Sequence, residues 1–331
     1  MSHYDAQNIV GIVFTVVSAL VVVAGSVFFI LLLRKTSKSY HDPTRRWVAI
    51  TKAALGLWLF SELFYVILNI ISLAHGSTYS YDSTLAKFIS YTSSILSWFF
   101  DVSQALTFLA LFYLARAFTL LRVDETSKRF RIGKSFSFGA VILIPVLSFT
   151  AMCLWLSTRE GYYSWSYNSS DYERVMMRRL VAQIFDLICG IFNLLCAIGA
   201  ITYIALVRKN ALKGPLHKVS FASFATVSQY RASNIALAIS IVWFIRAVWS
   251  LFAQLSSQYG YYYYNYDTYT WFSIVSLVVG ILGSFAVFIM LYLLATQDKY
   301  GLNRRGELAQ PAKLNDEEAS GAHITTANSV Y

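Results

Sequence analysis

Apolar residues run through this chain in seven long stretches, and most of the charged residues fall in the short gaps between them. Each stretch is about 20 to 28 residues long, and an α-helix needs about 20 apolar residues to cross the hydrocarbon core of a bilayer. The pattern therefore predicts an all-α polytopic membrane protein, a bundle of seven transmembrane helices. The predicted spans are residues 8–33, 48–73, 88–115, 135–156, 180–206, 235–255 and 271–294.

Composition agrees with this pattern. Apolar residues make up 57% of the chain and charged residues only 13%, whereas about 25% of the residues of a soluble domain are charged. The spans leave no room for a folded soluble domain. We expect a short extracellular N-terminus at 1–7, a transmembrane domain at 8–295, and a tail at 296–331 that is polar, lacks apolar periodicity and should be disordered in the cytoplasm.

Lys and Arg are distributed unevenly between alternate gaps, and this distribution predicts the orientation. Of the 27 Lys and Arg residues, 21 belong to the side of the gaps after spans 1, 3 and 5 and the tail, counting Lys52 just inside the second span, and 5 lie in the other gaps. Short cytoplasmic loops retain such residues, so the N-terminus should be outside and the C-terminus in the cytoplasm. The same charge would attract anionic inner-leaflet lipids. It forms no basic domain with interleaved aromatics, so nucleic acid is not an expected partner.

The first span and a single sequon point to the secretory pathway. The first stretch is too long for a cleaved signal peptide and has no basic segment before it, so we expect it to be retained. Asn168 begins the sequon Asn-Ser-Ser in a gap that the charge pattern places outside. We therefore expect a multi-pass glycoprotein of the plasma membrane or another secretory-pathway membrane, with a glycan on Asn168.

Four ionisable residues lie inside the predicted spans, where hydrocarbon should exclude them. They come from four different spans: Glu62, Asp101, Asp186 and Arg246. A charge at the centre of a membrane helix costs about 2.5 to 3.5 kcal/mol on insertion scales, so these groups should face one another or a wet cavity. Their depths along the helices allow all four to border one outward-facing cavity.

The acids in this group outnumber the base by three to one. If Arg246 pairs with one carboxylate, the other two should be protonated or should bind a cation or an amine. The alternative is a buried hydrogen-bond network that only holds the bundle together, because interhelical polar contacts of this type contribute about 0.6 kcal/mol on average.

Tyrosines are concentrated in the gaps predicted to be outside, and Tyr261, Tyr262, Tyr263 and Tyr264 follow one another directly. Tyrosine is common in the aromatic belts at membrane interfaces. It also suits recognition surfaces, because it offers a rigid face and a hydroxyl. Four successive tyrosines cannot all face lipid, so this segment should pack on the helix ends or cover a ligand.

Small residues are frequent in the fifth and seventh spans. They are Gly190, Ala197, Gly199 and Ala200 in the fifth span, and Gly280, Gly283, Ser284 and Ala286 in the seventh. Such residues let helices approach one another closely. We expect them to pack within the bundle, with packing between protomers as the alternative.

Residue types exclude several cofactor-dependent classes of membrane protein. A retinal protein needs a Lys in its last span, which this chain lacks. Intramembrane zinc and haem sites need His ligands, and all five His residues lie outside the predicted spans. The three cysteines lie within spans, where we interpret them as packing residues. We expect no metal, no cofactor and no enzymatic activity.

The architecture resembles that of G-protein-coupled receptors: seven spans, the N-terminus outside, basic inner loops and a flexible inner tail. Arg116 ends the third span, but the acidic residue that precedes this arginine in rhodopsin-like receptors is absent. Tyr292 lies in the last span, but the Asn-Pro that precedes this tyrosine in those receptors is absent too. The sixth span also lacks proline. The resemblance covers the architecture and implies a receptor-like shape; it does not extend to the sequence motifs of the rhodopsin-like class.

The leading functional hypothesis is a receptor-like or sensory protein that binds a small ligand in the outward-facing cavity. Membrane lipids and a cytoplasmic protein that contacts the basic loops and the tail are its expected partners. A proton- or cation-coupled transporter is the first alternative, with the acids as the loading groups, although the odd span number and the shortage of broken helices count against it. A structural membrane organiser without ligand chemistry is the second.

Overall fold

The computed structural model of the chain describes residues 3–36, 45–75, 84–120, 128–163, 169–213, 222–258 and 266–297. These residues form helices in the order α1 (His3–Lys35), α2 (Arg46–His75), α3 (Thr84–Leu120), α4 (Lys128–Tyr163), α5 (Ser169–Lys213), α6 (Ala222–Gln258), α7 (Tyr266–Val275), the π-helix η5 (Ser276–Leu282) and α8 (Gly283–Thr296).

Seven helical stretches of the described residues are long and apolar enough to cross a membrane. They run from Ile9 to Lys35, Arg46 to His75, Thr84 to Phe118, Gly133 to Arg159, Glu173 to Lys209, Tyr230 to Ser256 and Thr270 to Thr296. Six of the seven predicted spans lie inside one of these stretches. The first predicted span begins one residue before its stretch, but still within α1. The all-α, seven-span prediction is confirmed, and the chain is a multi-pass integral membrane protein.

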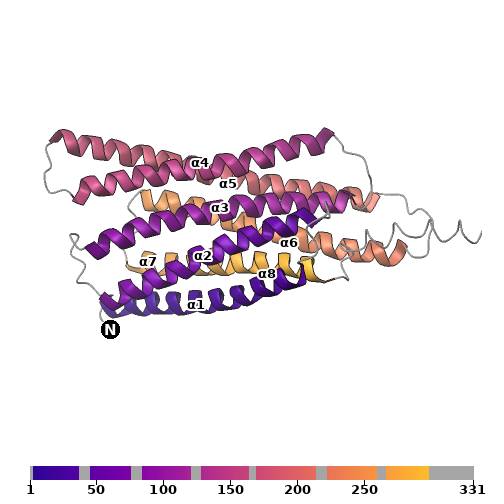
Figure 1. Ribbon diagram of the computed structural model, residues 1–331, viewed down its shortest axis with the longest axis horizontal. Coiled ribbons are helices and arrows are strands. Elements are labelled where there is room, and N and C mark those ends of the chain that lie inside the picture. The colour runs from indigo at the N-terminus through magenta and orange to yellow at the C-terminus, as the bar shows by residue number, and fades with distance from the viewer. Residues whose placement is uncertain are drawn as a thin grey trace, which may run out of the picture.

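The helices lie side by side along the long axis of the molecule (Figure 1). The start of α1 and the end of α8 lie at opposite ends of the bundle, as an odd number of spans requires. The end at which α1 finishes and α2 begins carries Lys35 and Arg46, and we call it the basic end. The Lys and Arg distribution predicts that this end faces the cytoplasm.

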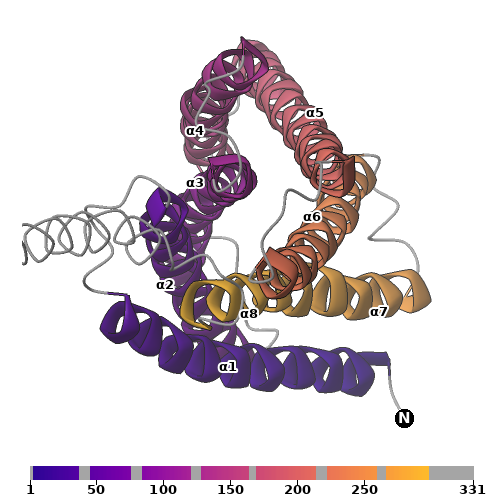
Figure 2. The ribbon, with the colours of Figure 1, turned by 90° about the vertical axis from the view of Figure 1, so that its right-hand side faces the viewer.

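The α3 helix is the centre of the bundle. It contacts α2, α4, α5 and α6, and 56% of its most apolar window is buried, against 28% for α1. Figure 2, viewed along the bundle, shows α1 on the outside, beside α8. Side chains on α3 can therefore meet groups from both halves of the chain.

Large apolar side chains cover the outside of the bundle. Leu20 and Ile142 are each 65% exposed, and Val23 is 64% exposed. Water would penalise such a surface by about 25 cal/mol per Å², whereas lipid chains solvate it without cost. The exposed apolar faces therefore support the membrane assignment.

Serine and threonine hydroxyls within the spans bond mainly to their own helix. The Thr51 hydroxyl donates to the Trp47 carbonyl at 2.8 Å, and the Thr107 hydroxyl donates to the Ser103 carbonyl at 2.8 Å. A hydroxyl in hydrocarbon needs an acceptor, and the carbonyl four residues earlier provides one. Ser103 is an exception, because its hydroxyl donates to the Ala54 carbonyl at 2.7 Å and so joins α3 to α2.

At the basic end of the bundle, two basic side chains donate hydrogen bonds to carbonyl groups at the C-termini of helices. Arg45 donates from Nη2 to the Ala295 carbonyl near the end of α8, at 3.3 Å. Lys52 donates from Nζ to the Thr36 carbonyl after α1, also at 3.3 Å. The last carbonyls of a helix have no partner within the helix and attract cations. These bonds therefore tie the ends of the first and last spans to the start of the second.

The last span is not a regular α-helix. Residues Ser276–Leu282 form the π-helix η5 between α7 and α8. At its start, Trp249 of α6 donates from Nε1 to the Ser276 hydroxyl at 3.3 Å. The small residues of this span were expected to pack against neighbours, yet a Cβ added at Gly280 would meet no atom within 4 Å. For this glycine the prediction of packing within the bundle is wrong, and the alternative of packing between protomers stays a prediction.

Close packing of α1 on α2 gives the first testable prediction. A Cβ at Gly25 would lie 2.7 Å from Leu59 Cδ2 and 3.6 Å from Trp58 Cζ3. We expect Gly25→Ile to lower the free energy of unfolding by about 1 to 3 kcal/mol, because the added side chain forces the helices apart. Thermal unfolding of the purified protein in detergent measures this loss.

Gly139→Ile on α4 is the matched control, because a Cβ there meets no atom within 4 Å. It introduces the same side chain into a helix without overpacking. Equal destabilisation by the two variants would show that α1 and α2 are not packed as described.

Candidate functional site

The four intramembrane charged residues come together in the structure. Glu62 lies on α2, Asp101 on α3, Asp186 on α5 and Arg246 on α6. Arg246 interacts electrostatically with Glu62 and with Asp101, and Asp101 interacts with Asp186. Each of the four residues therefore lies within electrostatic range of at least one other, and we call this group on four helices the charge cluster. Asp101 is the middle residue of the span Thr84–Phe118.

Arg246 is buried, with 7% of its surface exposed, and its guanidinium lies over an aromatic ring. Its Cζ is 4.7 Å from the centroid of the Phe100 ring on α3. A desolvated cation over an aromatic face gains about 2 kcal/mol. In the described part of the chain, no carboxylate oxygen lies within 4.0 Å of the guanidinium, and Nε is buried without a hydrogen bond. The acids thus act on Arg246 through space rather than through a direct ion pair.

Two donors on α4 hold the two aspartates. The Ser148 hydroxyl donates a short hydrogen bond to Oδ2 of Asp101. Trp155 donates from Nε1 to Oδ2 of Asp186 at 2.7 Å. A carboxylate can accept about four hydrogen bonds, so each aspartate keeps unused acceptor capacity. These unused acceptor positions are ones that a cationic group could fill.

Glu62 differs from the aspartates in its environment. It is 6% exposed and has no hydrogen-bond partner among the described residues. Its partner is Arg246, which acts on it electrostatically. One turn further along α2, Tyr65 donates its hydroxyl to the Ser93 carbonyl on α3 at 3.0 Å. This bond fixes α2 against α3 beside the cluster.

Helices α5 and α6 pack closely against each other one turn from Asp186. A Cβ at Gly190 would clash with Oε1 of Gln254 and would lie 3.0 Å from a Leu251 methyl group. Gly190 follows Asp186 by one helical turn, so any larger residue there would displace the Gln254 and Leu251 side chains of α6. For Gly190, the prediction that small residues pack within the bundle is confirmed.

Asn193 adds an unpaired polar atom to the same helix. It is 7% exposed, and its Oδ1 has no hydrogen-bond partner in the described part of the protein. Its Nδ2 lies 4.0 Å from the Cys189 sulfur. All three cysteines are free, and two of them are buried. The described residues contain no group of three His, Cys, Asp or Glu side chains that could hold a metal ion.

Sequence reasoning selected the four charges but not the side chains that hold them. Phe100, Ser148 and Trp155 are uncharged, and nothing in their sequence context distinguishes them from other span residues. The remaining predictions concern segments that the structure does not describe. Tyr261, Tyr262, Tyr263, Tyr264 and Asn168 lie outside the described residues, so the tyrosine surface and the glycan remain predictions.

Comparisons of the chain with protein-family models, curated proteins and solved structures found no match. The site must therefore be interpreted from its own chemistry. Its chemistry is that of an acid-rich cluster with a single guanidinium, located within the membrane.

Mutation of Arg246 tests the charge cluster. We expect Arg246→Gln to lower the free energy of unfolding by about 3 to 5 kcal/mol, because the acids would lose their buried counter-charge. Adding Glu62→Gln should restore part of this loss, because it removes the acid that depends most on Arg246. Thermal and denaturant unfolding in lipid nanodiscs measure both effects.

Arg179→Gln on α5 is the control, since Arg179 is exposed and its loss should change stability by less than about 0.5 kcal/mol. If the double variant is as unstable as the sum of the two single variants predicts, Glu62 and Arg246 are not coupled.

Proposed function

We propose that this protein is a receptor-like or sensory membrane protein that binds a small monovalent cation between Asp101 and Asp186. The ligand would be an alkali-metal ion or a protonated amine. The observation that carries the proposal is that Asp101 lies within electrostatic range of Asp186, that each carboxylate accepts one hydrogen bond from a neutral donor, and that the single guanidinium of Arg246 acts on both Glu62 and Asp101.

Electrostatics favour a cation at this position. One guanidinium, which acts on both Glu62 and Asp101, balances only one of the three carboxylate charges, so the cluster keeps uncompensated negative charge when its acids are ionised. Like charges in a membrane interior repel each other strongly unless a proton or a cation lies between them. A ligand cation removes this repulsion and binds to the spare carboxylate oxygens, which accept its hydrogen bonds or coordinate it. The affinity for the cation should therefore be highest where both aspartates contact it.

We propose that the N-terminus is outside, that Asn168 carries a glycan, and that the cluster opens to the outside. The Lys and Arg distribution and the sequon support this orientation. The segment with Tyr261 to Tyr264 follows α6, the helix of Arg246, in the sequence. The basic loops and the tail would contact a cytoplasmic protein partner. No catalytic chemistry is proposed.

Signalling requires that the ligand favour one helix arrangement over another. The bond from Trp249 to Ser276 offers a physical connection, because Trp249 follows Arg246 by three residues on α6 and Ser276 begins the π-helix η5. π-helical turns within α-helices are frequent at functional sites. A shift of α6 at Arg246 would therefore be transmitted to the last span.

A proton- or cation-coupled transporter is the second candidate, and η5 is the observation that favours it. Transporters often bind ions beside interrupted helices, and η5 interrupts the last span. The two candidates differ in outcome, since a transporter moves the cation across the bilayer and a receptor does not.

Cation binding is tested by thermal unfolding of the full chain in nanodiscs of neutral phosphatidylcholine. Sodium chloride and methylammonium chloride are compared with choline chloride, whose cation is too bulky, at equal ionic strength. We expect at least one of the small cations to raise the unfolding temperature saturably, by a stabilisation of about 2.7 kcal/mol at 100 times its dissociation constant. Asp186→Asn should abolish this response.

Glu173→Gln is the matched control, because it removes an exposed carboxylate of the same helix outside the cluster, and it should keep the response. A response that persists in Asp186→Asn, or one that choline reproduces, would contradict the proposal. Uptake of the cation into sealed liposomes, lost in Asp101→Asn, would instead assign the transporter. Tolerance of all neutral replacements without any cation response would leave only the structural role.

A further inference from the structure

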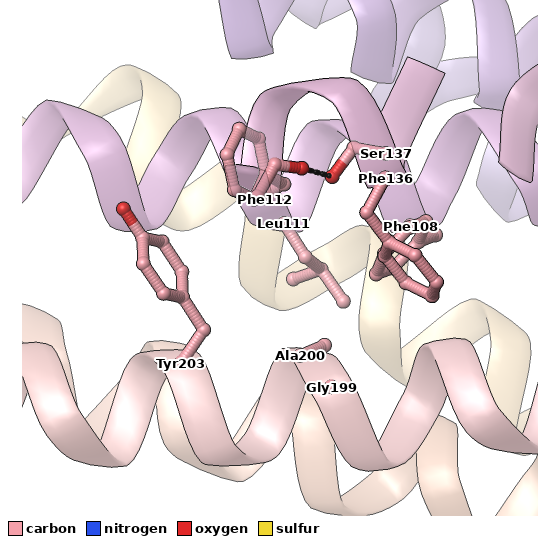
Figure 3. A pocket seen from close by; sticks show the side chains of 9 residues that line it. Phe108, Leu111, Phe112, Phe136, Ser137, Gly199, Ala200 and Tyr203 are labelled. Carbon is pink, nitrogen blue, oxygen red and sulfur yellow. Dashed lines mark hydrogen bonds between the residues drawn. The ribbon is translucent and has the colours of Figure 1, made fainter. Parts of the chain in front are cut away.

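A second potential binding site lies two helical turns from Asp101, towards the basic end. A cavity of about 290 Å³, open on one side, is lined by α3, α4 and α5 (Figure 3). Its walls include Phe108 and Phe112 of α3, Phe136 of α4, and Gly199 and Tyr203 of α5. It contains no member of the charge cluster and is therefore a separate site.

Aromatic rings and glycines shape this cavity. The rings of Phe112 and Tyr203 are stacked, with centroids 5.2 Å apart and planes 22° apart, and Figure 3 shows Tyr203 reaching from α5 towards α3. A Cβ at Gly133 would lie 2.7 Å from the Phe112 ring, so only glycine leaves that ring in place. A Cβ at Gly199 would meet one atom, 4.0 Å away on Phe136. The space beside Gly199 is thus part of the cavity.

The interior of the cavity does not require an occupant to form hydrogen bonds. The hydroxyl of Ser137, which also lines it, donates to the Gly133 carbonyl at 2.8 Å and is satisfied. Apolar cavities of about 150 Å³ stay dry and bind benzene, and this cavity is about twice as large. A hydrocarbon group is therefore the chemistry that fits it.

The cavity is accessible from the membrane. Phe136 is 44% exposed, although it lines the cavity, and Gly199 is partly exposed as well. Exposed surface at this depth of the bundle faces lipid, not water. A lipid chain can therefore enter between α4 and α5 without crossing a polar region.

A positive charge lies at one end of the cavity. Arg116 follows Phe112 by one turn on the same face of α3, and it interacts electrostatically with Tyr203. This is also the basic end, which the Lys and Arg pattern places in the cytoplasm. The inner leaflet carries the anionic phospholipids of a cell membrane.

We infer that this cavity binds one acyl chain of an anionic phospholipid of the inner leaflet, whose head group lies at Arg116. The hydrocarbon fills the space between Phe112, Phe136 and Gly199, and the Tyr203 hydroxyl lies near the head group. The positive charge of Arg116 at the end of the cavity selects the anionic lipid, because the apolar cavity itself would accept the acyl chain of any phospholipid.

Photo-crosslinking in nanodiscs tests this inference. Phosphatidylserine and phosphatidylcholine with the same diazirine-bearing acyl chain are each added to full-length protein, and adducts are mapped by peptide mass spectrometry. We expect adducts on the cavity residues of α3, α4 and α5, about fivefold more from phosphatidylserine. Arg116→Gln should remove this preference, and Gly199→Leu, which fills the cavity, should lower cavity adducts about tenfold.

Gly139→Leu is the matched control, because it adds the same side chain to exposed α4 away from the cavity, and it should leave cavity labelling unchanged. Equal labelling by the two lipids would overturn the anionic assignment, and unchanged labelling in Gly199→Leu would overturn the site. If Gly199→Leu does not fold, Gly199→Val decides, because it also occupies the cavity. Labelling spread evenly over exposed residues such as Ile142 and Ile198 would likewise overturn the inference.

Discussion

Hydrocarbon cannot solvate an isolated charge, and the central part of this bundle depends on how that constraint is met. Four helices each contribute one ionisable side chain to the membrane interior, and the single guanidinium of Arg246 lies where Glu62 and Asp101 both act on it. The Phe100 ring supplies part of the stabilisation that water would otherwise give. Because the two aspartates keep unused acceptor capacity, the same constraint that assembles α2, α3, α5 and α6 also creates the candidate cation site.

The two proposed sites divide the bundle by depth and by chemistry. The charge cluster lies around the middle of α3, and the apolar cavity lies two turns nearer the basic end of the same helix. The stacked rings of Phe108 and Trp243, with centroids 5.9 Å apart, connect α3 to α6 at the level of the cavity. A lipid chain in the cavity would therefore press on the helix that carries Asp101 and, through Trp243, on the helix that carries Arg246.

Apolar periodicity and charge were sufficient to predict the seven spans and the four residues of the cluster, because the cost of burying charge depends on residue type alone. The roles of Ser148 and Trp155 could not be predicted, because they depend on the rotation of α4 about its own axis. Many rotations of α4 would place apolar residues against lipid, so the apolar pattern does not select one. The π-helix η5 and the cavity were also missed. Gly199 was interpreted as a packing residue, yet it borders open space, and only the positions of α3 and α4 distinguish the two roles.

Cysteine accessibility tests most directly whether the charge cluster faces one water-filled, outward-opening cavity. In a background without Cys153, Cys189 and Cys196, single cysteines replace Glu62, Asp101 or Asp186, and a charged, membrane-impermeant thiol reagent is added from one side of intact cells. Cysteines at positions 101 and 186 should react from outside, while one at the lipid-facing position of Leu20, which is 65% exposed, should not. Reaction only from the cytoplasmic side, or at none of the cluster positions, would contradict this account.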